Sequence, residues 1–350
     1  MPDTRLISTD IDNINLFDKK VWDTILPIQV IANDPILRSP LINILGSCPL
    51  DGGGDYAETA FTRRLTGDVR QAVPEVNVIS DGVGQFKDAL MALYRYKSWK
   101  QEDITADITG NNFLREIGDK SVQWWADQCQ KIILKLLRAV FENALKTSHQ
   151  VNASTHPMSW EAIQLATSML GDKWRDLATI IMHSKQFNNL LTGGMVKYRD
   201  AGELGYDILV KGTIPAIFGI PILVTDTVPV TVKGNDTYYH SYIGGKGVID
   251  FRMIGFNNVL HYDPMKGAGT DYILQTTKVM AHIPGVKFVR ANATTQNFFS
   301  DTDFTNPACW QKIAEDDKDI PLVELITKAD AISLPPVIAP VAQPQPEPEP

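Results

Sequence analysis

Residues 112–146 read NFLREIGDKSVQWWADQCQKIILKLLRAVFENALK, and this stretch decides the fold. After Gly118 it contains no Gly or Pro, and it is rich in residues that lose little freedom in a helix. Apolar side chains recur at the helical spacing of three and four: Trp125, Cys129, Ile132, Ile133, Leu136, Val140 and Ala144. A second face carries Lys131, Lys135, Arg138, Glu142 and Lys146. The pattern predicts one helix, with Asn112 as its N-cap, roughly 50 Å long.

The composition of the chain is that of a globular protein. Its 350 residues can bury a large core, and its net charge of -8 argues against a main outer surface that grips nucleic acid. Cys48, Cys129 and Cys309 are odd in number and far apart, so a disulfide framework is not expected. The first residues lack a basic region followed by an apolar run, so no secretory signal is expected.

Residues 1–50 are interrupted by prolines. Short apolar clusters alternate with Pro27, Pro35, Pro40 and Pro49, which disfavour a long helix. We therefore expect an extended arm in which only residues 18–25 form a short helix. Its apolar content predicts that it lies on another surface, either of its own domain or of a neighbouring copy.

Residues 51–98 begin with Asp51-Gly-Gly-Gly-Asp55, which lacks the context of a phosphate-binding motif and is interpreted as a flexible link. Residues 71–80 and 86–99 then alternate with period two around the turn signal Asp81-Gly82. This pattern predicts a long two-stranded hairpin, which is marginal alone and needs a partner surface. Ser98 is expected to cap a short helix at 99–107.

The second half of the chain is rich in predicted strands. Ser159 is expected to cap a helix, 177–182 to form a buried strand, and 184–191 to form a helix. Further strands are expected at 206–210, 220–225, 228–232, 238–243, 248–251, 272–282 and 286–289. Residues 318–328 are expected to form a short helix or a turn, and the Pro- and Glu-rich residues 331–350 to remain unfolded.

Catalytic chemistry has no recognisable pattern in this sequence. The six histidines show no metal-ligand spacing, and CxxC and HExxH are absent. We therefore expect no catalytic residues, no metal and no cofactor. Lys131, Lys135 and Arg138 form a basic stripe, which is either a solvated face or a face turned toward a polyanion such as DNA.

Four segments carry a resemblance to a known family. They are LGDKWRDLATIIMHS (170–184), LLTGGMVKY (190–198), IPAIFGIPILVTDTVP (214–229) and YHSYIGGKG (239–247). With the order arm, hairpin, long helix and strand cluster, the chain resembles the Hong Kong 97-type major capsid proteins of tailed bacteriophages. The resemblance covers roughly residues 50–330 and is strongest between 170 and 250.

The resemblance implies an α+β fold with the following parts: an N-terminal arm (1–50), an extended β-hairpin loop (51–98), a peripheral domain (99–159 and 266–330) with the spine helix 112–146, a mixed axial domain (160–265) and a disordered tail (331–350). It implies a structural, non-enzymatic protein that assembles into hexamers and pentamers of an icosahedral shell around double-stranded DNA. The expected partners are other copies, portal, scaffolding and decoration proteins, and DNA held without sequence specificity. No membrane partner is expected. The expected location is the virion capsid, assembled in the host bacterial cytoplasm.

Candidate assembly residues lie in and around the predicted hairpin: Arg70, Asp81, Gly82, Gly84, Lys87, Arg95 and Lys97. Some relatives join subunits through lysine, but no pattern marks Lys87 or Lys97, so no crosslink is expected. One alternative is an encapsulin-like bacterial compartment, which a neighbouring cargo gene would indicate. The other is an enzyme, which would elute as a small oligomer.

Overall fold

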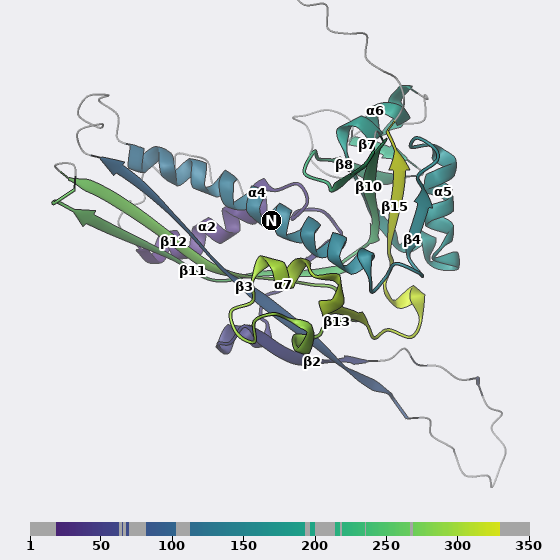
Figure 1. Ribbon diagram of the computed structural model, residues 1–350, viewed down its shortest axis with the longest axis horizontal. Coiled ribbons are helices and arrows are strands. Elements are labelled where there is room, and N and C mark those ends of the chain that lie inside the picture. The colour runs from purple at the N-terminus through teal and green to yellow at the C-terminus, as the bar shows by residue number, and fades with distance from the viewer. Residues whose placement is uncertain are drawn as a thin grey trace, which may run out of the picture.

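The computed structural model describes residues 19–62, 65, 68–69, 82–102, 113–192, 197–199, 214–217, 219–234, 236–266 and 269–329. Figure 1 shows an elongated sheet with helices along it on one side and a second, more compact group of strands and helices on the other. The expected strands at 71–80 and 206–210, and the tail 331–350, lie outside the described residues.

The spine of the molecule is helix α4, Phe113–Glu142. The predicted helix is confirmed, although it ends at Glu142 and residues 143–148 form turns. Its two faces are also as expected. The apolar residues from Trp125 to Val140 are buried, whereas Lys131, Lys135, Arg138 and Glu142 are exposed. The helix is therefore held by packing along one stripe.

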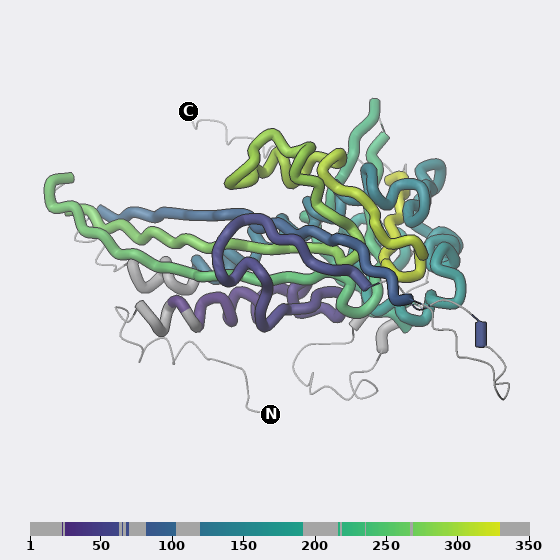
Figure 2. Tube along the Cα trace, turned by 90° about the horizontal axis from the view of Figure 1, so that it is seen from below, coloured from purple at the N-terminus to yellow at the C-terminus, as the bar shows by residue number. Residues whose placement is uncertain are grey.

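A five-stranded sheet runs beside α4, and Figure 2 shows its long strands side by side above the helices. The strand order is β1-β11-β12-β3-β2. The strands are β1 (Ile42–Ile44), β11 (Ile249–Asp263), β12 (Thr270–His282), β3 (Gln85–Glu102) and β2 (Tyr56–Thr62). Antiparallel pairing joins β3, β12 and β11, and Trp125 Nε1 on α4 donates a 2.7 Å hydrogen bond to Gln275 Oε1 on β12.

An eight-stranded sheet forms the other group, in the order β4-β15-β10-β5-β8-β7-β6, with β9 paired to β10. Its strands are β4 (Gln150–Ala153), β5 (Leu177–Met182), β6 (Lys197–Arg199), β7 (Ile214–Ile217), β8 (Ile220–Val224), β9 (Val230–Lys233), β10 (Asp236–Gly245) and β15 (Leu322–Lys328). Helix α5, Trp160–Ser168, packs on β15 and β4, and helix α6, Ser184–Thr192, follows β5. The expected helices and the strands at 177–182, 220–225 and 238–243 are thus confirmed.

A third, small group sits against β3 and α4. It consists of β13 (Val286–Phe288), helix α7 (Asp301–Thr305) and β14 (Trp310–Lys312). Phe288, Phe304 and Trp310 are fully buried in it, and both phenylalanine rings contact the Trp310 ring edge to face. The aromatic cluster fixes α7 beside the spine helix.

The N-terminal arm differs from the expectation. Helix α2 runs over Lys19–Asn33 and continues through Pro27. A proline in a helix interior normally costs about 3 kcal/mol of stability. Burial of Leu26 and Val30 in the core shared with α4 and β11 offsets that cost. Described arm residues therefore lie on the chain's own domain, which was one of the two alternatives.

The hairpin region also differs. The strand expected at 86–99 is confirmed as β3, but its described partners are β2 and β12. The helix expected to begin at Ser98 is wrong, because Ser98 and Trp99 pair with Leu274 and Ile273 in the sheet. Residues 89–93 are buried, so this part of β3 has a core within its own subunit.

Two strands were misjudged. Residues 322–328 form β15 in the interior of the eight-stranded sheet, where a helix or turn was expected. The strand expected at 248–251 is the start of the much longer β11. Because β4 and β15 pair within the same sheet as β10, the expected sequence limits of the axial domain leave out two of that sheet's strands.

Candidate assembly and DNA-facing surfaces

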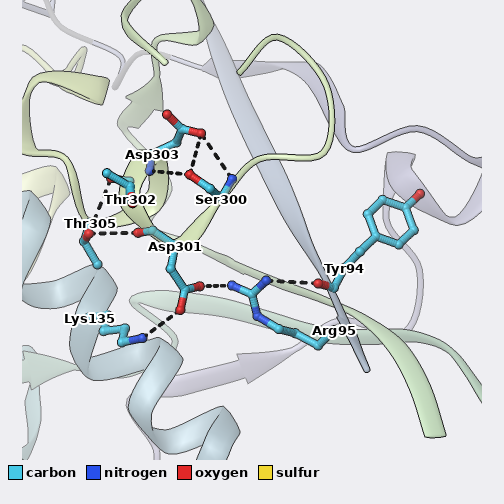
Figure 3. A network of polar contacts seen from close by, with 8 residues as sticks. All are labelled: Tyr94, Arg95, Lys135, Ser300, Asp301, Thr302, Asp303 and Thr305. Atoms are coloured by element: carbon cyan, nitrogen blue, oxygen red, sulfur yellow. Dashed lines mark hydrogen bonds and ion pairs between the residues drawn. The ribbon is translucent and has the colours of Figure 1, made fainter. Parts of the chain in front are cut away.

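Two candidate residues from different groups meet at one carboxylate, as Figure 3 shows. Arg95 Nη2 on β3 forms an ion pair with Asp301 Oδ1, and Lys135 Nζ on α4 lies 3.0 Å from Asp301 Oδ2. Arg95 Nη1 also donates to the Tyr94 carbonyl at 2.9 Å. Side chains nominated for assembly and for DNA contact therefore tie α7 to β3 and α4 within one subunit.

The position of Asp301 is set by the start of α7. Ser300 caps this helix, and Asp303 closes a capping box with it. The buried Asp303 carboxylate accepts hydrogen bonds from Thr294, Thr295 and Ser300. Burial alone would raise the pKa of Asp303, but the hydrogen bonds from Thr295 and Ser300 hold it well below its usual range.

The remaining assembly candidates are dispersed along β3. The Lys87 side chain is 82% exposed, 3.7 Å from Glu58, whereas Lys97 Nζ sits 5.7 Å from the Trp124 ring centroid. Gly82 and Gly84 are exposed, and Asp81 and Arg70 lie outside the described residues. These residues do not converge on a single site in the described part of the chain.

The basic stripe on α4 is partly neutralised. Arg138 Nε pairs with Glu142 Oε1 at 2.9 Å, and Lys135 is held by Asp301. Lys131 is exposed on the same face. Two of the three DNA-facing candidates thus already have a carboxylate partner, which weakens the stripe as a polyanion-binding face.

The glycine-rich link is more tightly anchored than a flexible connection. Arg252 Nε donates to Asp51 Oδ1 at 2.8 Å, and Lys278 Nζ donates to the carbonyls of Leu50 and Gly54 at 2.7 and 2.9 Å. The Cys48 amide and Arg252 lower the pKa of Asp51. The link is therefore fixed to β11 and β12.

Buried histidine–carboxylate pairs were not predicted from the sequence. His240 Nδ1 lies 2.8 Å from Glu324 Oε1, and His282 Nε2 lies 3.0 Å from Asp88 Oδ2. Burial on its own would raise the pKa of Asp88, but the hydrogen bond with His282 and the charge of His282 keep that pKa below its usual value. Each pair joins strands far apart in sequence, so no local motif could have signalled it.

In the described ranges, no helix is long and apolar enough to span a membrane. Within the same residues, no three His, Cys, Asp or Glu side chains are grouped so that they could hold a metal ion.

Comparisons with known proteins agree with this geometry. The family model "Major capsid protein 13-like" matches residues 99–246. The major capsid protein of Bacillus phage SPP1 is 24% identical over 272 residues, which is 76% of this chain and 82% of that protein.

Solved structures match over most of their length. The capsid of Ralstonia phage GP4 has a TM-score of 0.58 at 10% identity, covering 80% of this chain and 91% of that one. The head structure of Helicobacter pylori bacteriophage KHP40 has a TM-score of 0.56 at 10% identity, covering 83% and 87%.

The fold is therefore that of the Hong Kong 97-like major capsid proteins, as the sequence resemblance implied. With the sequence relationships, it identifies the chain as a major capsid protein of a tailed bacteriophage, a structural protein of the virion head. The encapsulin-like alternative is not favoured, because these relatives are phage capsid proteins.

Proposed function

We propose that copies of this chain assemble into hexamers and pentamers that close an icosahedral shell around double-stranded DNA. The observation that carries the proposal is the relationship to the SPP1 major capsid protein over 82% of that protein's length. The chain acts as a structural subunit without catalysis. Assembly takes place in the host bacterial cytoplasm, with scaffolding, portal and decoration proteins as further partners.

The proposed domain boundaries follow the two large sheets. Residues 1–50 act as an arm and 51–98 as the extended loop, and these segments add β1, β2 and most of β3 to the five-stranded sheet. Helix α4 and strands β11 and β12 belong to the peripheral domain. The axial domain comprises residues 160–245 together with β4 and β15, because these two strands share its sheet, whereas β11 belongs to the five-stranded sheet.

The proposed contact with DNA is weak and sequence-independent. It uses Lys131 on the exposed face of α4, with smaller contributions from Lys135 and Arg138, whose charges are paired with carboxylates. Such a contact weakens as salt rises. The net charge of -8 is consistent with weak binding to the packaged DNA, because a negatively charged chain attracts DNA little overall.

The direct test is to express the chain, alone and with its scaffolding protein, and to examine it by sedimentation and electron microscopy. We expect closed shells or capsomers. A protein that remains a small oligomer under both conditions would contradict the proposal and favour the enzyme alternative.

A second test concerns the extended loop. Replacing residues 63–84 with a Gly/Ser linker of equal length leaves β2 and β3 intact, so we expect a folded subunit that fails to assemble. The replaced segment has to end before β3, because residues 89–93 of that strand belong to the subunit core. Circular dichroism checks folding, and normal shells from this variant would count against a role of the loop in assembly.

A further inference from the structure

The second half of strand β3 is an open edge of the five-stranded sheet. Residues 92–102 pair with β12 on one side, whereas β2, on the other side, pairs only with residues 85–91. Among the described residues, no strand pairs with the β2 side of β3 beyond Met91. Figure 2 shows β3 as the outermost strand beside β12 along this half. We call the side of residues 96–102 that faces away from β12 the β3 edge.

The backbone groups on this edge follow from the alternation of a strand. In an antiparallel ladder, successive residues direct their N–H and C=O groups to opposite sides. The Ala92 amide donates to the Asp55 carbonyl at 2.9 Å, on the side of β2. Because the register between β3 and β12 is continuous, the backbone groups of Tyr96, Ser98 and Lys100 face that same side. Unpaired donors and acceptors of this kind are a template for another strand.

The β3 edge is also open to solvent. Tyr96 is 74% exposed, and Ser98, Lys100 and Glu102 are exposed as well. Lys100 Nζ lies 3.1 Å from Glu102 Oε1 of the same strand, and both side chains are about half exposed or more, so this ion pair contributes little. The open part begins after Tyr94, whose carbonyl already accepts a hydrogen bond from the Arg95 side chain.

The sequence of the edge complements itself in one antiparallel register. When Ser98 of two copies lie opposite each other, Tyr96 of each copy faces Lys100 of the other, and Lys97 faces Trp99. Each lysine then lies opposite an aromatic ring, which is a favourable cross-strand pairing. Tyr96, Ser98 and Lys100 also direct their backbone groups toward the partner strand, so the hydrogen bonds of the ladder can form.

Neighbouring two-fold registers lack this match. An axis at Arg95, Lys97 or Lys100 places a cation opposite its own copy. An axis at Tyr96 places Arg95 opposite Lys97. Like charges directly opposite each other destabilise a strand pair. With the axis at Trp99, neither lysine faces an aromatic ring.

We propose that the β3 edges of two copies pair antiparallel across a two-fold axis at Ser98, which joins their five-stranded sheets into one. This inference rests on the proposed self-assembly and specifies one of its contacts. The contact is isologous, whereas the contacts around a hexamer or pentamer are heterologous. It therefore links a copy in one ring to a copy in the neighbouring ring.

The first test reads the register. In a Cys48→Ser background, Ser98→Cys should give disulfide-linked dimers in oxidised particles. Directly opposed residues of a hydrogen-bonded pair have Cα atoms about 5.5 Å apart, which a disulfide can span. Tyr96→Cys should give none, because the two copies of residue 96 would lie about 13 Å apart along the strands. No dimer from Ser98→Cys, or as much dimer from Tyr96→Cys, would overturn the proposal.

The second test removes a donor from the edge. Ser98→Pro should raise the protein concentration at which half of the subunits sediment as particles by about tenfold or more, because each pair of copies loses two hydrogen bonds at the axis. Ala60→Pro is the matched control. By the same alternation, the exposed Ala60 directs its amide away from β3, so this variant should stay within about twofold.

Unchanged assembly of Ser98→Pro, or an equal loss in both proline variants, would overturn the proposal. Circular dichroism checks that both variants fold, and the cysteine variants test the same register without a change in the backbone. Failure of the parent protein to form any particle would instead count against self-assembly itself.

Discussion

Gly244 offers a sharp test of how the two sheets are joined. It lies in β10, paired with Thr179 on β5 and with Leu322 on β15. A Cβ added there would be 2.1 Å from Leu41 Cδ1 and 3.0 Å from Leu322 Cδ1, whereas carbon atoms pack at about 3.5–4.0 Å. Both leucines are fully buried, so they have little room to move.

Overpacking a core in this way costs about 1–3 kcal/mol, and Gly→Ala recovers about 0.4–1 kcal/mol from the unfolded state. We therefore expect Gly244→Ala to lower the free energy of unfolding by about 1–1.5 kcal/mol. Urea titration of unassembled subunits, followed by tryptophan fluorescence, measures the change.

Two variants sharpen the experiment. Gly46→Ala is the control, since this exposed glycine has no atom within 4 Å of an added Cβ, and it should change stability by less than about 0.5 kcal/mol. Leu41→Ala removes the clashing atom, so the double variant should be at least about 1 kcal/mol more stable than the sum of the single effects predicts. Wild-type stability of Gly244→Ala, or strict additivity, would refute the reasoning.

Three other predictions concern the α7 region and the tail. Asp303→Ala should lower the free energy of unfolding by about 2 kcal/mol because it removes a buried carboxylate and leaves its partly buried donors unpaired, as urea titration would show. Since the folded-state pKa of Asp303 is lowered, its stabilisation is present above about pH 4, the unfolded value, and is lost as pH falls further; a wild-type pH profile in Asp303→Ala would contradict this. Asp301→Asn should cost at most about 1 kcal/mol, because its ion pairs with Arg95 and Lys135 are partly exposed; a loss above about 2 kcal/mol would show that α7 depends on them. Removing residues 335–350 should leave assembly intact by electron microscopy, and loss of particles would argue for a structural role of the tail.

The sequence predicted those elements whose burial pattern is local. The stripe from Trp125 to Val140 specifies α4, and the apolar run 177–182 specifies β5, because one face or both faces are uniformly apolar. Helix α2 was underestimated because Pro27 signals a break, and only the packing of its neighbours Leu26 and Val30 shows why the helix continues.

Strand β15 was misjudged for a different reason. In the run Leu-Val-Glu-Leu-Ile, the charged Glu324 suggests a segment that is partly exposed to solvent. In the structure, however, the Glu324 carboxylate is buried. Its partners, His240 and Gln150, come from strands 84 and 174 residues away. A charge that is satisfied only in three dimensions cannot be recognised from its neighbours in the chain.

The candidate surface residues were the least predictable part. Arg95 and Lys135 were assigned to different roles, but both contact Asp301, which lies 206 and 166 residues further along. The exposure of Trp160 could have been suspected, because this residue lies outside the apolar stripe of its helix, which consists of Ala162, Ile163 and Ala166. Exposure itself, however, follows from packing and not from spacing.

The place of β15 has a consequence for biosynthesis. This strand lies between β4, made far earlier, and β10, so the sheet keeps a gap until residues 322–328 have emerged from the ribosome. A nascent chain, or one released too early, leaves two strand edges unsatisfied and cannot present a finished subunit. A subunit therefore becomes competent to assemble only after β15 has been synthesised and has paired with β4 and β10.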